Sequence, residues 1–284
     1  GLRDLGLPSP PKVHLVELNP TGEKTLWFVH GLGSNLKFWR YQLNTFAAQG
    51  YRVIAMDMIG YGKSDKPARF PYSIPSMAFA LKEAMALMGV IKPIVIGHSM
   101  GGHTALALAI EDSALIDTMI LVSPAGFEEF SAKDKLWFKR IFSSQLIKYA
   151  PESGVRNSIQ YNNFYQWRDD LEWLVEERVR ATGTPGFDNY AYANVKSIHG
   201  LLDTEYTRKN LSRIDVPTLI VFGHMDRLIP NRFMHGGHTE DVMRFGYEGI
   251  SGSTLVGLPK CGHTAQADCP DGVNNAINRF LSER

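Results

Sequence analysis

Short apolar runs rich in β-branched residues recur along the chain and predict β-strands. The runs are His14–Leu18, Thr25–Val29, Arg52–Met56, Ile94–Ile96, Thr118–Val122, Pro217–Phe222 and Ser253–Leu258. Between several of them the apolar positions recur with the helical period, over Trp39–Ala48, Ile74–Met88, Met100–Ile110 and Gly272–Ser282. Strands that alternate with helices are typical of an α/β fold with a mainly parallel central sheet and helices on both faces.

The alternation stops between about residues 127 and 206, where helical patterns follow one another without a convincing strand. This interval holds 15 of the chain's 31 aromatic residues, which is more than its share of the length. The pattern predicts an α/β core formed by residues 1–126 and 207–284, with residues 127–206 inserted as a helical cap. The turn Ser123–Gly126 and the charged stretch Arg208–Asp215 are the expected joints.

A serine lies between glycines at the predicted junction of a strand and a helix, in Gly97-His98-Ser99-Met100-Gly101. A strand, a sharp turn and a helix in this order form a nucleophile elbow, which exposes the serine hydroxyl. The glycines leave room for the turn, and the free N–H groups at the start of the helix favour negative charge above the serine. Ser99 is therefore the candidate nucleophile.

A serine hydroxyl becomes a strong nucleophile when a base takes its proton, and an acid commonly orients that base. Asp226 follows one predicted strand and His263 follows the next. Both would lie at the carboxyl edge of the sheet, where open α/β sheets place their sites. Serine, aspartate and histidine also occur in the order expected when an elbow serine heads a triad. The predicted catalytic residues are Ser99, Asp226 and His263.

Other histidines and carboxylates compete for these roles. His98 and His224 flank the candidate nucleophile and acid, and we expect them to pack beneath the site. His235 and His238 lack a clear third ligand, so a polar loop explains them better than a metal site does. The other carboxylates that rival Asp226 in this half of the chain are Glu240, Asp241 and Asp268.

Four motifs together resemble the α/β-hydrolase superfamily, and within it the capped serine esterases and lipases. The motifs are His30-Gly31-Leu32-Gly33, Asp57-Met58-Ile59-Gly60-Tyr61-Gly62-Lys63-Ser64, the Ser99 elbow, and the pair Asp226 and His263. The resemblance extends over nearly the whole length. It implies the α/β-hydrolase fold and a hydrolase that needs no cofactor and no metal. The Asp57 segment is expected to brace the site rather than to catalyse.

By this resemblance, the backbone N–H groups of Leu32 and Met100 would form an oxyanion hole. Each preorganised donor aimed at a developing oxyanion typically stabilises the transition state by about 3–4 kcal/mol. His30 and Gly31 would lie beside the substrate in the same loop. The aromatic interval would supply an apolar pocket, and its expected substrate-binding residues are Trp137, Phe138, Phe142, Phe164 and Trp167.

Composition and charge narrow the range of partners. The 30 basic and 29 acidic residues give a net charge of +1, and no long charged block points to nucleic acid. No apolar run approaches the roughly 20 residues of a transmembrane helix. The segment Lys133–Tyr149 is basic and amphipathic, which leaves contact with a lipid surface open, but we expect its apolar side to face the cleft or the core. Oligomeric state stays open, and so does the compartment, because Gly1 is not an initiator methionine.

The chain has two cysteines, Cys261 and Cys269. We expect reduced thiols because disulfide frameworks usually use more cysteines, although a single bridge stays open for an exported protein. A structural zinc site would need further Cys or His ligands.

The expected activity is hydrolysis of carboxylic esters with hydrophobic acyl or aryl groups through an acyl-enzyme intermediate. One alternative is a carbon–carbon bond hydrolase of the meta-cleavage type, although these usually carry a Gly-Pro-Gly-like loop where this chain has Leu32-Gly33-Ser34-Asn35. Another is a non-catalytic receptor for a hydrophobic ligand, because a fold does not determine a function. Related thioesterases, perhydrolases and aminopeptidases also stay open, whereas epoxide and haloalkane hydrolases carry an aspartate where this chain has Ser99.

Overall fold

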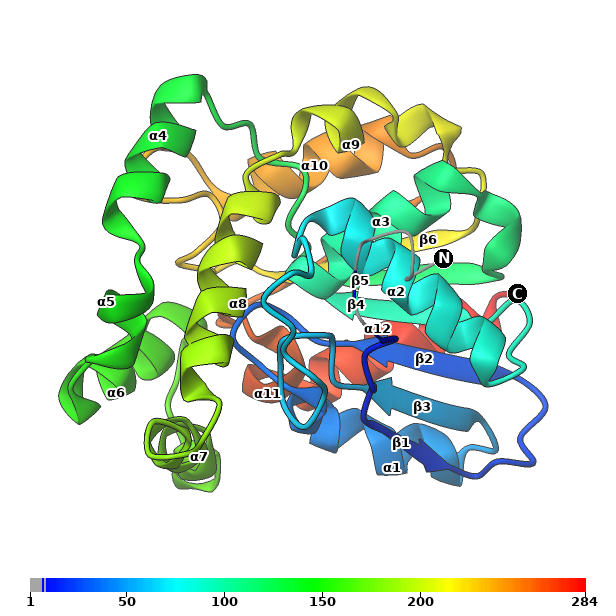
Figure 1. Ribbon diagram of the computed structural model, residues 1–284. Coiled ribbons are helices and arrows are strands. Elements are labelled where there is room, and N and C mark those ends of the chain that lie inside the picture. Colours follow the sequence, from blue (N-terminus) through cyan, green and yellow to red (C-terminus); the bar gives the residue numbers. More distant parts are fainter. Residues whose placement is uncertain (1–6, 8) are drawn as a thin grey trace.

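A seven-stranded sheet forms the centre of the molecule in the computed structural model, which describes Leu7 and residues 9–284 (Figure 1). The first residues of the predicted core segment 1–126 lie outside this described part. The strands are β1 (Leu15–Leu18), β2 (Thr25–Val29), β3 (Arg52–Met56), β4 (Ile94–His98), β5 (Thr118–Val122), β6 (Thr218–Gly223) and β7 (Thr254–Leu258). Their order is β1-β3-β2-β4-β5-β6-β7, and β1 alone among them runs antiparallel to its neighbour. The predicted α/β class is therefore confirmed.

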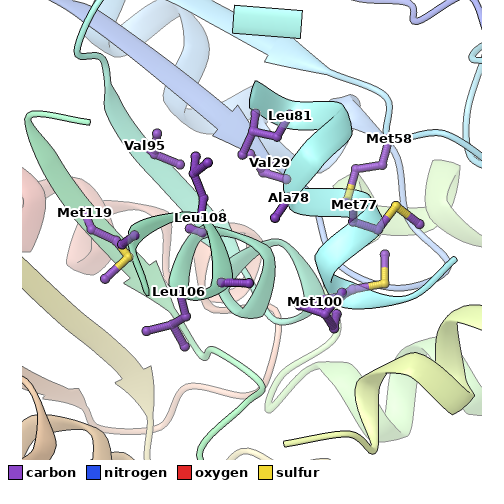
Figure 2. Close-up of a cluster of buried hydrophobic side chains, with 14 of the residues drawn as sticks. Val29, Met58, Met77, Ala78, Leu81, Val95, Met100, Leu106, Leu108 and Met119 are labelled. Atoms are coloured by element: carbon purple, nitrogen blue, oxygen red, sulfur yellow. The ribbon is translucent and has the colours of Figure 1, made fainter. Parts of the chain in front are cut away.

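Helices cover both faces of the sheet because the central strands bury alternate side chains on opposite sides. Trp27 and Val29 belong to the core beneath α2 (Ile74–Leu87), α3 (Met100–Glu111) and α10 (Thr239–Gly249). Leu26 and Phe28 belong to the core beneath α1 (Arg40–Ala48) and α12 (Pro270–Ser282). Figure 2 shows side chains of α2 and α3 packed against strand residues in the first of these cores.

Strand order brings the chemically interesting loops together. The chain passes from β2 outward to β3 and then returns to the other side of β2 with β4. Such a reversal opens a crevice at the carboxyl ends of the strands, where ligands of open α/β sheets bind. Val29 pairs with Gly97, so the loop after β2 lies beside the turn after β4.

The helices that follow β5 and precede β6 in the chain form a layer beyond this carboxyl edge (Figure 1). Its members are α4 (Ala132–Ile141), α5 (Ser144–Lys148), α6 (Glu152–Asn163), α7 (Glu172–Ala181) and α8 (Phe187–Leu201). The next helix, α9 (Glu205–Lys209), hydrogen-bonds to α3 through Thr207 Oγ1 and His103 Nε2, 2.9 Å apart. The boundary predicted at residue 206 therefore falls inside a helix that packs on the core.

Shorter helices complete the chain. They are the 3₁₀ helices η2 (Leu36–Trp39), η3 (Ser113–Leu115), η4 (Asp169–Leu171) and η5 (Leu211–Arg213), and α11 (Ala265–Asp268). Within Leu7 and residues 9–284, no helix combines the length and the apolar character needed to cross a membrane.

The buried side chain of His103 makes the free energy of unfolding depend on pH in the acidic range. It is fully buried on α3, and burial lowers its pKa from 6.5 to about 3, with Asp203 opposing that shift. The unfolded chain therefore binds this proton at a higher pH than the folded chain does. Between about pH 6.5 and about pH 3 this residue lowers the free energy of unfolding as the pH falls, by up to about 1.4 kcal/mol per pH unit.

We expect His103→Gln to lose less stability than the wild type when the pH falls from about 7.5 to about 5. The difference in the two losses should be about 2 kcal/mol, because glutamine has no proton to take up on unfolding. Chemical unfolding of both proteins at the two pH values measures it. Equal losses would show that His103 does not titrate differently in the folded and unfolded chains.

Candidate active site

Ser99 occupies a sharp turn between β4 and α3. Its backbone has φ 50° and ψ −112°, and 8% of the residue is exposed. Glycines on either side make this turn fit: a Cβ on Gly97 would lie 2.4 Å from the carbonyl oxygen of Gly101, and a Cβ on Gly101 would lie 2.3 Å from that of Val29. Only glycine tolerates such approaches, so the predicted tight turn is present.

His263 and Asp226 form a hydrogen-bonded pair near this turn. Nδ1 of His263 lies 2.7 Å from Oδ2 of Asp226, and both residues are buried. Oδ1 of Asp226 accepts from the backbone N–H groups of Leu228 and Ile229, at 2.7 and 3.0 Å. Because a carboxylate only accepts, the proton of the imidazole lies on Nδ1, and Nε2 is left with a free lone pair. The arrangement orients a base.

Ser99 and His263 line the same cavity, whose volume is about 1770 Å³. Within Leu7 and residues 9–284, the Ser99 hydroxyl makes no hydrogen bond. The cavity wall contains five of the residues that the sequence predicted for the site, namely Leu32, Trp137, Phe138, Phe142 and Phe164. The four aromatic residues among them come from the segment between β5 and β6 in the chain.

In the described part of the chain, five other predicted site residues do not line the cavity, namely Asp226, His30, Gly31, Met100 and Trp167. His30 is fully buried, donates from Nδ1 to the Gly31 carbonyl at 2.7 Å, and accepts at Nε2 from the Met58 N–H at 3.0 Å. Trp167 packs edge-on against Phe164, away from the cavity. The structure thus makes His30 a brace of the loop rather than a surface for substrate.

The loop after β2 touches the turn at Ser99. A Cβ on Gly31 would lie 3.2 Å from Cβ of Ser99 and 2.7 Å from Nδ1 of His98, so only a glycine backbone fits there. This contact puts Leu32 beside Ser99. Met100 is buried and begins α3, where the first backbone N–H groups of a helix have no partner within it.

Two further residues form hydrogen bonds that hold loops of the site in place. His98 donates from Nε2 to the carbonyl oxygen of His263 at 3.1 Å, and its pKa is held well below 6.5, first by burial and then by His263. Asp57 accepts from the Leu36 and Lys63 N–H groups, each at 2.8 Å. Both residues also line the cavity, so His98 does not lie wholly beneath the site as the sequence predicted.

Comparison with known proteins identifies the family. The family model described as the alpha/beta hydrolase fold matches residues 24–270. This chain belongs to the α/β-hydrolase fold family. The resemblance to the α/β-hydrolase superfamily is confirmed, and the family supports a hydrolytic enzyme.

Individual relatives of this α/β-hydrolase differ in activity. A 2-hydroxy-6-oxo-6-(2'-aminophenyl)hexa-2,4-dienoic acid hydrolase of Metapseudomonas resinovorans is 27% identical over 90% of this chain and 83% of its own. A probable hydrolytic enzyme of Pseudomonas aeruginosa has a TM-score of 0.83 and 25% identity, over 96% of this chain and 90% of that one. An esterase of Exiguobacterium antarcticum has a TM-score of 0.80 and 22% identity, over 96% of both chains, and shows the shared fold.

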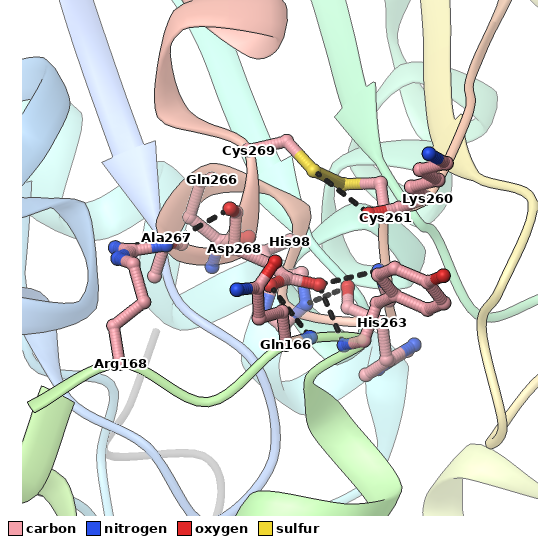
Figure 3. The surroundings of a disulfide bond; sticks show 12 residues. His98, Gln166, Arg168, Lys260, Cys261, His263, Gln266, Ala267, Asp268 and Cys269 are labelled. Carbon is pink, nitrogen blue, oxygen red and sulfur yellow. Dashed lines mark hydrogen bonds between the residues drawn. A yellow bond between two sulfur atoms is a disulfide. The ribbon is translucent and has the colours of Figure 1, made fainter.

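In this α/β-hydrolase, the loop that carries His263 is closed at its base by a disulfide between Cys261 and Cys269 (Figure 3). The expectation of two reduced thiols is therefore wrong. The chain turns back through α11 after His263, which brings the two Cα atoms within 5.9 Å of each other. Spacing in the sequence did not reveal this turn.

Asp268 links the same loop to the helical layer. Its Oδ2 accepts from the N–H groups of Gly262 and Tyr165, each at 2.7 Å. Arg168 donates to the carbonyl oxygens of Ala267 and Asp268 at 2.9 and 3.0 Å (Figure 3). Segment 165–168 and the His263 loop therefore hold each other in place.

Sequence reasoning missed several polar residues of the cavity. Arg178, Tyr190 and Asn194 line it from α7 and α8, and Glu128 lines it from the segment after β5. In the sequence, the only sign of these polar residues was their position within segment 127–206, where the aromatic side chains indicated an apolar pocket. Glu128 bonds to His235.

We expect Asp268→Ala to lower the free energy of unfolding by about 2–3 kcal/mol, because two N–H groups would be left without their acceptor. Hydrolytic turnover should fall with it as the His263 loop loosens. Asp215→Ala, at an exposed aspartate with no hydrogen bond within the described residues, serves as the control. A loss for Asp268→Ala no larger than for the control would contradict the role of this carboxylate.

Proposed function

We propose that this protein is a serine hydrolase that cleaves carboxylic esters with hydrophobic acyl or aryl groups. Ser99 Oγ attacks the ester carbonyl carbon while His263 Nε2 takes its proton, and Asp226 stabilises the imidazolium. The oxyanion is bound by the N–H groups of Leu32 and Met100. The alcohol leaves with the proton from His263, and water then releases the acid from the acyl-enzyme by the same steps.

One observation carries this proposal. The hydroxyl at the strained turn and the imidazole oriented by Asp226 line one cavity. Ser99 and His263 come into hydrogen-bonding contact in the substrate complex, because catalytic hydrogen bonds are often long in free enzymes and tighten when substrate binds. Without that shared cavity the three residues would be only separate structural features.

The wall of the cavity supports the substrate class. Phe138 and Phe142 stack with ring centroids 5.4 Å apart, and Ile198 and Leu202 line the cavity beside them. Such surfaces bind medium acyl chains or aryl groups by burying their apolar area. We propose that residues 127–206 serve as the cap that encloses this part of the substrate.

Ser99→Ala should lower kcat for p-nitrophenyl butyrate by roughly four to six orders of magnitude, because the variant has no nucleophile. A fluorophosphonate should add one covalent phosphonyl group to the wild type, at Ser99, and none to the variant. Mass spectrometry of the labelled protein and a spectrophotometric assay measure the two effects.

Ser123→Ala is the matched control. Ser123 also follows a strand at this edge, has φ 42°, and is fully buried, with a hydroxyl that has no hydrogen-bond partner within the described residues. We expect it to keep both turnover and labelling. Turnover retained in Ser99→Ala would reject the proposed nucleophile, and a wild type that neither turns over esters nor reacts would favour a ligand receptor.

Arg178 favours a second candidate, the carbon–carbon bond hydrolase. It lines the cavity, and its Nη1 is buried without a hydrogen-bond partner within Leu7 and residues 9–284. Its guanidinium carbon lies 4.8 Å from the Phe187 ring centroid and 5.0 Å from that of Tyr190. An arginine held in this way can bind a carboxylate, and the dienoic acid named for the Metapseudomonas relative carries one.

Arg178→Gln should lower kcat/KM for a carboxylate-bearing dienone or hemisuccinate ester by about 10- to 100-fold, and change it little for p-nitrophenyl butyrate. Arg279→Gln, at an exposed arginine on α12 that does not line the cavity, is the control. Faster turnover of the dienone than of any ester would make carbon–carbon cleavage the main activity. Equal losses on neutral and carboxylate substrates would remove the argument for this candidate.

A further inference from the structure

The outer face of α4 exposes large apolar side chains. Leu136, Trp137 and Ile141 are 49%, 38% and 48% exposed, whereas Phe138 on the opposite face is buried against α8. The expectation that the apolar side of this segment faces the cleft or the core therefore holds for Phe138 and for Trp137, which lines the cavity, and not for Leu136 and Ile141. Figure 1 shows α4 at the outer edge of the helical layer.

A residue from the core extends this apolar face. Phe233, in the loop between β6 and α10, is 85% exposed and stacks on Trp137 with ring centroids 6.3 Å apart. Both rings also line the cavity that contains Ser99. The exposed apolar surface is thus continuous with the entrance of the cavity.

Cations border the same face. Lys133 and Arg140 are exposed and share the helical face of Trp137, at spacings of four and three residues, and Lys139 is exposed beside them. Within the described residues these three form no ion pair, whereas Lys135 pairs with Asp203. We call the set of Lys133, Leu136, Trp137, Lys139, Arg140, Ile141 and Phe233 the α4 surface.

The charges of the α4 surface select among partners. The whole chain is nearly neutral, with a net charge of +1, so three unpaired cations in one place are a local feature. A second copy that docked through the same face by a twofold axis would set cations against cations. An anionic lipid surface offers negatively charged headgroups, which attract the cations. It also offers an apolar layer for the rings and aliphatic side chains.

We propose that the α4 surface binds anionic membranes and places the cavity entrance against the lipid. Leu136, Trp137, Ile141 and Phe233 enter the boundary between headgroups and acyl chains, while the long cationic side chains reach the phosphate groups. Membrane binding itself does not depend on catalysis. Only the further consequence, that ester lipids enter the cavity directly from the membrane, rests on the proposed function.

Vesicle sedimentation with the full chain carrying Ser99→Ala tests the binding separately from hydrolysis. We expect binding to vesicles of phosphatidylcholine with about one third phosphatidylglycerol, and much weaker binding to phosphatidylcholine alone. Lys133→Gln, Lys139→Gln and Arg140→Gln together should weaken binding on the order of a hundredfold. Leu136→Ser with Ile141→Ser should weaken it by more than about tenfold, because apolar area no longer leaves water.

Leu87→Ser with Ile91→Ser is the matched control. These residues are 86% and 87% exposed; Leu87 ends α2 and Ile91 lies between α2 and β4, at the opposite end of the strands from the cavity. The control should bind like the parent protein. All variants should hydrolyse a soluble ester normally when Ser99 is restored, since none of the changed residues lines the cavity.

Three results would overturn the proposal. One is the absence of binding to anionic vesicles at low ionic strength. Another is an equal loss of binding in the control and in the Leu136 and Ile141 variant, which would remove the α4 surface as the site. The third is a loss with the cations but none with Leu136 and Ile141, which would show attraction to the charged lipid surface alone and rule out the proposed entry of the apolar side chains.

Discussion

The turn at Ser99 is possible only because backbone segments approach each other more closely than side chains allow. Gly97 packs on the Gly101 carbonyl, Gly101 packs on the carbonyl oxygens at the end of β2, and Gly31 packs on Ser99 itself. These contacts hold the serine backbone in a region that L-residues seldom adopt. The same contacts bring the loop after β2 and the start of α3 to the hydroxyl, so the candidate nucleophile and the candidate oxyanion donors are positioned together.

The other half of the site depends on a loop that is held from several directions. Asp226 fixes the imidazole of His263, His98 binds its backbone carbonyl, and a disulfide closes the base of the loop. Asp268 then ties the loop to segment 165–168 of the helical layer. Positions that lie far from the reacting atoms thus determine where Nε2 of His263 points, and a movement of the helical layer would be transmitted to the base.

The fold and the pairing of Asp226 with His263 could be predicted because their signals are local. A strand that ends in a chemically distinctive residue places that residue at the carboxyl edge, whatever the rest of the chain does. The disulfide, the Nη1 of Arg178 that has no partner among the described residues and the exposed face of α4 could not be predicted in this way. Each depends on how one helix packs on another, and apolar periodicity shows that a helix has an apolar face without showing what covers it.

The central claim is that Ser99, His263 and Asp226 act as one unit. The most direct measurement compares kcat for a soluble ester in Ser99→Ala, in His263→Ala and in the double variant. Residues that act together give losses that do not add, so the double variant should be about as slow as either single variant. A double variant slower by the product of the two single losses would contradict the account.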